Sequence, residues 1–332
     1  MPLPTSMRAV VLDHAPAPPE ALTIRDLPVP APEPGWVLIE VKAFGLNRSE
    51  LITRLGLSGA AVTFPRVLGI EAAGVVAACP GGELEVGTQV VAMMGGMGRA
   101  FDGGYAEYTC VPVAQTIPIV SDLPWTTIGA LPETLQTAHG SLTVGLDVQP
   151  GQTLLVRGGT SSVGMTAALL AKRQGATVLA TTRAEGKMKA LEAIGVDHVL
   201  VDGAGGVAAQ VRALVPDGVD AVLELVGTPT LPDSLAATRV HGTVCCTGAL
   251  SNVFIVPDFY PTAYIPSGVR LTGYGGDASD LPRAVLQDFL DALAAGDATF
   301  PISKTYTMDE IVEAHRDMEA DRATGKLVVS TG

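Results

Sequence analysis

The stretch TLLVRGGTSSVGMTAALLAKRQGATVLATTRAEGK, residues 153–187, decides the fold of this chain. Residues 153–157 are apolar and partly β-branched, as expected of a buried strand, and a glycine-rich turn follows at 158–162. Apolar residues then recur at helical spacing, and 177–183 has the pattern of a second strand. A helix that starts after such a turn presents unpaired N–H groups and the positive end of its dipole. We therefore predict that this turn binds a phosphate group without a metal.

The turn and the start of the helix supply the expected contacts to a dinucleotide cofactor. These contacts are Gly159, Thr160, Ser161, Ser162, Val163 and Gly164. The dinucleotide-binding pattern GxGxxG is not met, because Ser161 stands at its middle glycine; the serine side chain either donates to a phosphate or pushes the cofactor outward. We expect Gly159 to allow the sharp turn and Gly164 to allow close packing of helix and strand. The alternative is an ordinary turn in another parallel-sheet protein.

The end of the second strand favours NADPH over NADH. Sites for NAD usually place an acid about 20 residues after the turn, where it binds the ribose hydroxyls, whereas NADP sites place cations there. This chain has Thr182, Arg183 and Lys187 in that region, and no acid precedes Glu185. Arg183 can bind the extra phosphate through paired charge-assisted hydrogen bonds, and Lys187 adds a charge one helical turn later. The alternative is that both cations are solvated residues at the start of a helix that Glu185 caps.

Length and composition indicate a soluble enzyme of two domains. The chain has 332 residues, more than a single core usually supports, and its 38 glycines and 24 prolines indicate many short strands and turns. A net charge of −13 argues against nucleic acid as a main partner. No apolar run approaches the roughly 18 residues of a membrane span, and the first ten residues lack a signal-peptide core. We therefore expect no membrane association and a cytoplasmic location.

The pattern of expected elements changes twice along the chain. A first block of short strands has members at 7–13, 36–47, 74–78, 87–93 and 105–112. From about 124 to 276 strands and helices alternate, which implies a parallel sheet covered by helices on both faces. The remaining residues are expected to form a helix at 282–296, a short strand, a helix from 308 to about 321 and a strand at 325–330. We place one domain at 1–123 and 277–332 and a dinucleotide-binding domain at 124–276.

With these elements placed, the chain resembles a zinc-independent member of the medium-chain dehydrogenase/reductase superfamily, similar to NADPH:quinone oxidoreductases, over essentially its full length. The segments that carry the resemblance are FGLNRSELITRLG (44–56), VLGIEAAGVV (67–76), GGYAEY (103–108), LPETLQTAHGSL (131–142), the cofactor turn and GKLVV (325–329). The resemblance implies an α/β protein in which a GroES-like β-barrel catalytic domain carries an inserted Rossmann domain with a doubly wound parallel sheet. It also implies an active site in the interdomain cleft, and a homodimer or homotetramer paired through the edge strand at 269–276.

The same resemblance implies a site without metal. Zinc-dependent relatives carry two Cys and one His at the positions that here hold Asn47, Ile70 and Glu133, and neither Asn47 nor Ile70 is a normal zinc ligand. The four-cysteine structural zinc lobe is missing as well, because 93–109 contains no Cys. Neither a disulfide framework nor a CxxC pair is formed by the cysteines of this chain, which are Cys79, Cys110, Cys245 and Cys246. We expect the neighbours Cys245 and Cys246 to be small core residues.

Without a metal to polarise an alcohol or a carbonyl, the chemistry needs a substrate that accepts hydride readily, such as a quinone or an enone. The resemblance places Asn47 near the nicotinamide, and Tyr105 offers a hydroxyl, so these two are the candidate catalytic residues. The alternatives are an asparagine that satisfies backbone groups of a turn and an aromatic strand residue, which is also our interpretation of Tyr108. His139 is the one histidine expected in the cleft, where we expect it to pack or hydrogen-bond rather than donate a proton.

Further residues follow by position in the resemblance. Glu71 matches an acid common in the superfamily, but it stays outside the catalytic set because it can simply pair with a cation such as Arg54. The further expected cofactor contacts are Asn47, Thr137, Leu225, Gly227, Gly248, Ala249 and Lys326.

Three functions remain open at this point. The first is an NADPH-dependent reductase that transfers hydride to a quinone or another conjugated carbonyl. The second is a reductase of the same fold that acts on a 2-alkenal or an enoyl thioester, although the acidic balance gives no sign of the basic rim that a thioester carrier would favour. The third is a non-catalytic protein that binds NADPH.

Overall fold

The computed structural model describes residues 3–203 and 206–332, so residues 1, 2, 204 and 205 of the expected domains lie outside the described residues. Contacts between residues divide the chain into two units, one of 1–136 with 277–332 and the other of 137–276. The second unit ends at the expected residue but begins at 137 instead of 124. The reason is that the helix α2 (Trp125–Ile128) packs on strands of the first unit.

A parallel sheet forms the centre of the second unit. Its strands are β9 (Thr153–Arg157), β10 (Thr177–Thr182), β11 (His198–Val201), β12 (Val219–Glu224), β13 (Thr238–Cys246) and β14 (Arg270–Gly273). They lie in the order β11-β10-β9-β12-β13-β14, and neighbouring strands are parallel. This is the order of a doubly wound dinucleotide-binding sheet, whose winding reverses between β9 and β12. The parallel sheet predicted from the alternation of strands and helices is confirmed.

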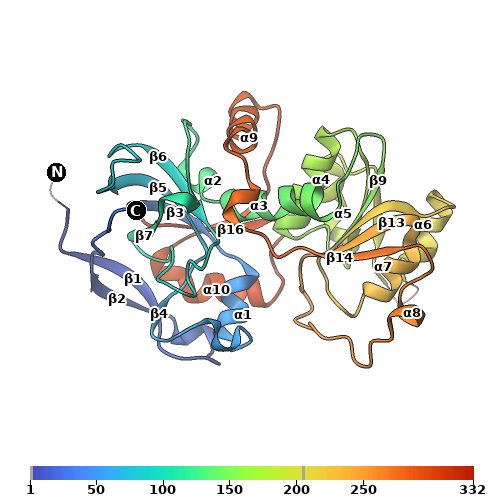
Figure 1. The fold of residues 1–332 in the computed structure, drawn as a ribbon, viewed down its shortest axis with the longest axis horizontal. Coiled ribbons are helices and arrows are strands. Elements are labelled where there is room, and N and C mark those ends of the chain that lie inside the picture. The colour runs from blue at the N-terminus through green and yellow to red at the C-terminus, as the bar shows by residue number, and fades with distance from the viewer. Residues whose placement is uncertain (1–2, 204–205) are drawn as a thin grey trace. The chain divides into compact units, whose positions relative to one another are not determined.

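Helices cover both faces of this sheet (Figure 1). They are α4 (Ser162–Arg173), α5 (Met188–Ala193), α6 (Ala208–Leu214), α7 (Leu231–Ala237) and the short α8 (Pro261–Tyr264). α6 and α7 pack on a core that includes Leu155, Leu179, Val222 and Val244, which are neighbours across one face of the sheet. α4 contacts β9 and β10, and Figure 1 shows α4 and α5 on the other side.

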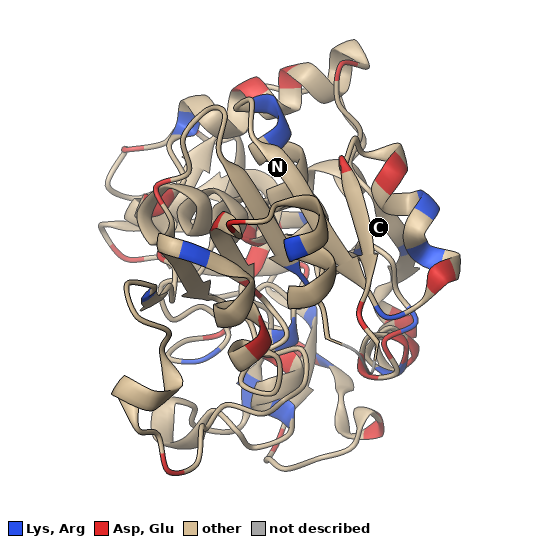
Figure 2. Cartoon of the chain, turned by 90° about the vertical axis from the view of Figure 1, so that its right-hand side faces the viewer, with Lys and Arg blue, Asp and Glu red and all other residues tan. Residues whose placement is uncertain are grey.

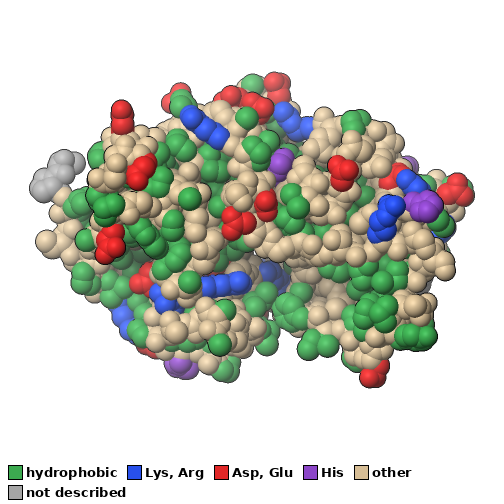
Figure 3. Space-filling view, in the orientation of Figure 1, with side chains coloured by type: hydrophobic (Ala, Val, Ile, Leu, Met, Phe, Trp, Pro, Cys, Tyr) green, Lys and Arg blue, Asp and Glu red, His purple; other side chains and the backbone are tan. Residues whose placement is uncertain are grey.

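One edge of the second unit carries exposed apolar side chains. β14 lies at the end of the strand order, and its residues are exposed or half-buried. The segment between β13 and α8 adds exposed apolar residues, which are Val253, Phe254, Ile255, Phe259 and Tyr260. Figure 3 shows hydrophobic side chains gathered over the region of α8, at the lower right of the view.

The first unit consists mainly of antiparallel sheet. Its strands are β1 (Ser6–Leu12), β2 (Thr23–Pro28), β3 (Trp36–Gly45), β4 (Arg66–Val67), β5 (Glu71–Ala78), β6 (Gln89–Met93), β7 (Tyr108–Pro112), β8 (Thr116–Pro118), β15 (Ile302–Thr307) and β16 (Lys326–Ser330). The larger sheet has the order β15-β16-β3-β5-β6-β8, with β7 also paired to β3, and the smaller has the order β2-β1-β4. β16 pairs with β3, so the last strand of the chain is held by a strand near its start.

Helices also occur in the first unit, and α3 continues past residue 136 into the second unit. They are α1 (Arg48–Arg54), α2, α3 (Pro132–Gly140), α9 (Arg283–Ala295) and α10 (Ile311–Glu319). α9 agrees with its prediction, since Pro282 precedes it and Gly296 ends it with a φ of 78°. The helix predicted from 308 begins as a 3-10 turn before α10. Neither β2 nor α1 follows from the sequence pattern, although α1 begins directly after the candidate residue Asn47.

Charged residues of both signs are distributed over the chain. Figure 2 shows residues of both signs scattered over the ribbon. Asp and Glu are the more numerous, at 34 against 21 for Lys and Arg. Among the residues that the structure describes, no helix is both long enough and apolar enough to cross a membrane.

Candidate functional site

The glycine-rich turn connects β9 with α4, as predicted. Gly158 turns the chain with a φ of 78°, the role that we expected of Gly159. A Cβ added at Gly159 would lie 2.8 Å from the Cβ of Ala180, so Gly159 is required instead for packing against β10. A Cβ added at Gly164 would lie 2.5 Å from the carbonyl oxygen of Gly158, so Gly164 allows the helix to approach the turn as expected. The glycines therefore allow the turn, β10 and the start of α4 to pack closely.

The hydroxyl of Ser161 is used inside the turn. Its Oγ accepts from the backbone N of Gly164 at 3.1 Å and donates to the carbonyl oxygen of Gly158 at 2.8 Å. Ser161 therefore caps α4. Thr181 on β10 also holds the turn, because its Oγ1 accepts from Gly158 N at 3.0 Å and its carbonyl oxygen accepts from Gly159 N at 2.9 Å. The side chains of Thr160, Ser162 and Val163 are half-buried at the start of the helix.

The predicted cations lie at the carboxyl end of β10. Thr182 is buried, and its Oγ1 accepts from the backbone N of Ala184 at 3.2 Å. Arg183 follows the strand and is exposed, while Lys187 is half-buried at the start of α5. Since β9 and β10 are parallel neighbours, Arg183 and the glycine-rich turn both lie at the carboxyl ends of the strands.

Two further turns, which follow the carboxyl ends of β12 and β13, contain other residues that we expect to contact the cofactor. A Cβ added at Gly248 would lie 2.8 Å from the carbonyl oxygen of Leu225, and the same oxygen accepts from Leu250 N at 2.9 Å. Gly227 has a φ of 112°, which favours glycine. The segments with Leu225, Gly227, Gly248 and Ala249 thus touch each other after β12 and β13. Thr137 lies instead in α3, where its carbonyl oxygen accepts from Ser141 Oγ at 2.6 Å.

A buried polar cluster lies in the first unit, and we call it the Lys326 cluster. It consists of Asn47, Glu50, Glu71, Glu133 and Lys326, none of which is more than 9% exposed. Nζ of Lys326 lies 2.7 Å from Oε1 of Glu71 and 3.5 Å from Oε2 of Glu133, and it donates to Oδ1 of Asn47 at 2.6 Å. Oε2 of Glu71 accepts from the backbone N of Glu133 at 2.9 Å. One ammonium group therefore joins β16 to α3, β5 and the start of α1.

Glu50 completes the Lys326 cluster from α1. Its carboxylate accepts from the backbone N of Asn47 at 2.8 Å and from that of Ile70 at 2.9 Å. Burial, assisted by the charge of Glu71, raises the pKa of Glu50 to about 7. Burial opposes the charge of Lys326, but the attraction of Glu71 and Glu133 outweighs it and raises the pKa of this ammonium. Sequence reasoning overlooked Glu50, for which its position three residues after a helix-capping asparagine is the available signal.

Asn47 and Lys326, both expected cofactor contacts, have partners inside the protein. Nδ2 of Asn47 donates to Glu71 at 2.9 Å and to Glu50 at 3.4 Å, so both N–H groups of the amide are directed at carboxylates. Lys326 has a side chain with no exposed surface and binds Glu71. In this structure the Asn47 amide and the Lys326 ammonium bind each other and the carboxylates of the cluster. They link strands and helices of the protein.

The ion pair suggested for Glu71 is also different. Its cation is Lys326 and not Arg54. Arg54 is buried and binds Oε2 of Glu319 at 2.6 Å and the carbonyl oxygen of Ala17 at 2.6 Å.

Tyr105 is a core residue, which corrects its assignment as a catalytic candidate. It has no exposed surface, and its ring stacks on Phe44 with centroids 4.6 Å apart. Its hydroxyl lies 3.2 Å from Nε2 of His315, and burial raises the pKa of Tyr105 well above its ordinary value. The alternative of an aromatic packing residue is the one that the structure supports.

The histidine that matters for the core is His315, which sequence reasoning missed. It is fully buried on α10 beside Tyr105, and burial together with the charge of Arg54 lowers its pKa to about 3. His139 lies in the last turn of α3 and is half-buried.

In the described part of the chain, a metal site is formed neither by the cysteines nor by the residues at the positions of the relatives' zinc ligands. No group of three or more His, Cys, Asp or Glu residues is arranged there to hold a metal ion. The cysteines of residues 3–203 and 206–332 are unpaired, and burial raises the pKa of Cys110 and Cys246 to about 11, which keeps these thiols unreactive.

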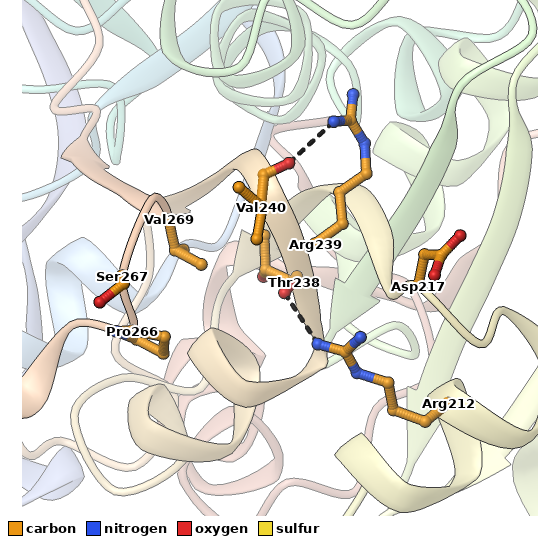
Figure 4. A pocket seen from close by; sticks show the side chains of 8 residues that line it. All are labelled: Arg212, Asp217, Thr238, Arg239, Val240, Pro266, Ser267 and Val269. Carbon is orange, nitrogen blue, oxygen red and sulfur yellow. Dashed lines mark hydrogen bonds between the residues drawn. The ribbon is translucent and has the colours of Figure 1, made fainter.

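A hollow of about 410 Å³ lies at the opposite ends of the strands, beside the amino ends of β12 and β13 (Figure 4). Two guanidinium groups face it, but the protein itself uses both. Arg212 donates to the carbonyl oxygens of Ala236 and Thr238, at 3.0 and 3.1 Å from one nitrogen. Arg239 donates to Asp220 at 2.6 Å and to the carbonyl oxygen of Val240 at 2.9 Å. We assign no ligand to this hollow.

Comparison with known proteins identifies the class and then the family. Residues 33–121 match the family described as "Alcohol dehydrogenase GroES-like domain", and residues 194–329 match "Zinc-binding dehydrogenase". With the strand order and the turn, these matches define an oxidoreductase with a nicotinamide cofactor. The chain belongs to the medium-chain dehydrogenase/reductase superfamily and is quinone oxidoreductase-like, as the resemblance indicated.

Several relatives carry related names. A "Probable quinone oxidoreductase" of Leishmania amazonensis is 35% identical over 68% of this chain, and the match spans only 64% of that protein. The "Quinone oxidoreductase" of Homo sapiens is 26% identical over 94% of both chains. "Prostaglandin reductase-3" of Mus musculus is 27% identical over 98% of this chain and 89% of its own length.

Solved structures agree with this fold. A quinone oxidoreductase of Pseudomonas syringae has a TM-score of 0.87 at 26% identity and covers 98% of this chain and 100% of its own. A mycobacterial protein complexed with NADPH has a TM-score of 0.86 at 29% identity, with the same coverage. A protein described as an NAD-dependent alcohol dehydrogenase has a TM-score of 0.87 at 28% identity, also with that coverage.

Proposed function

We propose that this protein is an NADPH-dependent reductase that transfers hydride to a quinone or another conjugated carbonyl without a catalytic metal. The observation that carries this proposal is the turn after β9 with Arg183 at the end of the neighbouring strand. The turn suits a pyrophosphate, because Gly158 and Gly164 let the strand end, the turn and the helix start pack closely, and the helix start supplies N–H donors. Relatives named for quinone reduction and a structural neighbour complexed with NADPH support the same proposal.

The choice of NADPH rests on charge at the end of β10. We propose that Thr182, Arg183 and Lys187 hold the 2′-phosphate of the cofactor, and that residues 159–164 hold its pyrophosphate. We propose further contacts from Thr137, Leu225, Gly227, Gly248 and Ala249. The bound cofactor would supply the hydride, and the protein would bind it, orient it and stabilise the charge that develops on the substrate oxygen. One similar structure is described as an NAD-dependent enzyme. A measured preference for NADH over NADPH would contradict this assignment.

The absence of a catalytic metal is supported by the Lys326 cluster. The ammonium of Lys326 stands 2.6 Å from Oδ1 of Asn47 and 3.5 Å from Oε2 of Glu133. A divalent cation bound to the same two oxygens would meet this buried positive charge, and the repulsion would not be screened by water. Ile70 offers no ligand atom in its side chain. We expect full activity in chelator, and elemental analysis that finds one zinc per chain would contradict this part of the proposal.

A substrate screen tests the reaction. NADPH absorbance is followed with quinones, 2-alkenals and enoyl thioesters, and we expect quinones or enones to be reduced while simple alcohols are not oxidised at a comparable rate. Faster turnover of 2-alkenals would favour the second function, which the similarity to a prostaglandin reductase also supports. A protein that binds NADPH tightly but reduces no member of the panel would instead have the third, non-catalytic function.

We also propose that two or four chains associate through β14. This strand ends the sheet order of the second unit, and exposed apolar residues lie at 253–260, in the segment that precedes α8. Pairing of β14 with its copy would cover an edge that otherwise exposes hydrogen-bonding groups.

A further inference from the structure

Glu224 is a buried carboxylate at the carboxyl end of β12. Its Oε1 accepts from the backbone N of Val226 at 2.8 Å, from that of Gly227 at 3.1 Å and from Oγ1 of Thr230 at 3.0 Å. Its Oε2 accepts from Oγ of Ser234 on α7. All four partners donate, and Glu224 itself has no exposed surface. The carboxylate therefore fixes the shape of the turn at 225–230.

No cation neutralises this carboxylate within the residues that the structure describes. The nearest candidate by register is Arg157, which is the partner of Glu224 in the pairing of β9 with β12. The guanidinium of Arg157 is already bound to Asp202 at 2.8 Å and to Asp233 at 2.6 Å. Arg157 is therefore paired with two other carboxylates, and the hydrogen bonds that Glu224 accepts come from N–H and O–H groups.

The position of Glu224 in the sheet indicates which half of a bound dinucleotide would lie near it. The winding of the sheet reverses between β9 and β12, which is where such sheets bind their ligands. If Arg183 binds the 2′-phosphate as proposed, the adenosine half of the cofactor lies over the carboxyl ends of β9 and β10. The nicotinamide half then belongs over the ends of β12 and β13, where Glu224 lies beneath the turn of Leu225 and Gly227.

We propose that Glu224 is a positioning residue that shapes the nicotinamide turn and whose charge favours oxidised over reduced cofactor. This inference rests on the proposed function. A bound NADPH would supply a hydride, which is one proton with two electrons, and its nicotinamide ring would thereby gain a positive charge. A fixed negative charge nearby stabilises that product in a medium of low dielectric constant. The conjugated acceptor would take up this hydride in a new bond to hydrogen and would then take a proton from solvent.

Glu224→Gln tests the charge separately from the shape. Glutamine keeps the acceptor oxygen for the turn, and its amide can donate to Ser234. In binding titrations we expect the affinity for NADP⁺ to fall by about fivefold or more, while that for NADPH changes by less than about twofold. The matched control is Asp220→Asn, which removes a carboxylate from the other end of the same strand, where it binds Arg239. This control should leave the ratio of the two affinities unchanged.

A second variant keeps the test decisive if the glutamine variant does not fold. Thr230→Lys leaves Glu224 in place and brings an ammonium within reach of Oε1, so it should shift the ratio in the same direction. Equal changes in both affinities, or an unchanged ratio in both variants, would overturn the inference and leave the proposed function standing. Failure of the unmodified protein to bind either cofactor would overturn the proposed function itself.

Discussion

At the scale of single residues, the Lys326 cluster shows how a buried charge can join distant parts of a chain. Lys326 and Glu71 have fully buried side chains, and Gly45 provides their space: a Cβ at residue 45 would lie 2.2 Å from Cε of Lys326. Breaking a buried ion pair from one side is costly, because it leaves the other charge without compensation.

Replacement of Lys326 should therefore destabilise the protein strongly. Lys326→Met removes the ammonium from Glu71 and Glu133, and we expect the free energy of unfolding to fall by about 3–5 kcal/mol in urea titrations. The control is Lys304→Met, which breaks an exposed pair with Glu313 and should change stability little. Similar losses in both variants would show that burial of the Lys326 cluster does not determine the effect.

Glu50 makes the stability of the fold depend on pH. Its pKa is raised from 4.5 to about 7, so the folded state binds more protons than the unfolded state between these values. This contribution is fully present below pH 4.5 and is lost as the pH rises through 7. Glu50→Gln lacks the titration, and its stability relative to the wild type should therefore rise across this interval in urea titrations. A difference between the two proteins that stays constant with pH would contradict the burial of a titrating Glu50.

At the scale of elements, the turn between β9 and α4 is fixed by the protein's own hydrogen bonds. Ser161 caps the helix, and Thr181 of the neighbouring strand binds two N–H groups of the turn. At position 161, where the pattern has a glycine, the serine side chain bonds to the turn itself. The glycines at 158 and 164 are needed because other atoms of the protein pack closely against the backbone there. We propose that the end of β10 decides the choice of cofactor.

A substitution at the end of β10 tests that choice. Arg183→Ala should weaken NADPH by about tenfold and leave NADH nearly unchanged, because only NADPH carries the phosphate. Wild-type protein should bind NADPH at least about tenfold more tightly than NADH, which corresponds to about 1.4 kcal/mol. Calorimetry on both proteins with both cofactors measures this. Equal affinities of the wild type for the two cofactors would refute the preference.

At the scale of the whole molecule, association through β14 is open to a direct test. Tyr274 N donates inward to the carbonyl oxygen of Cys246, so by strand alternation the N–H of Leu271 faces the outer edge. Leu271→Pro removes that donor and should lower the oligomer found by sedimentation or light scattering to a monomer. Leu271→Ala loses similar packing but keeps the N–H, and it should remain associated. An oligomer that survives the proline would place the contact elsewhere.

Sequence patterns alone determined the parallel sheet, the turn after β9, α9 and the cations at the end of β10. These features depend on local order: apolar periodicity, glycine beside a helix start, and proline and glycine at helix ends act over a few residues. The family resemblance added the GroES-like domain and the superfamily, because its motifs were matched as short segments.

Only the tertiary structure decided which polar residues are buried together. Asn47, Glu71 and Lys326 lie far apart in the sequence, and their hydrogen bonds depend on the pairing of β16 with β3 and of β3 with β5. Tyr105 turned inward for the same reason, since the core of the first unit is built from strands of both its sheets. A side chain's partners follow from burial, and burial follows from contacts between distant segments, which no local pattern encodes.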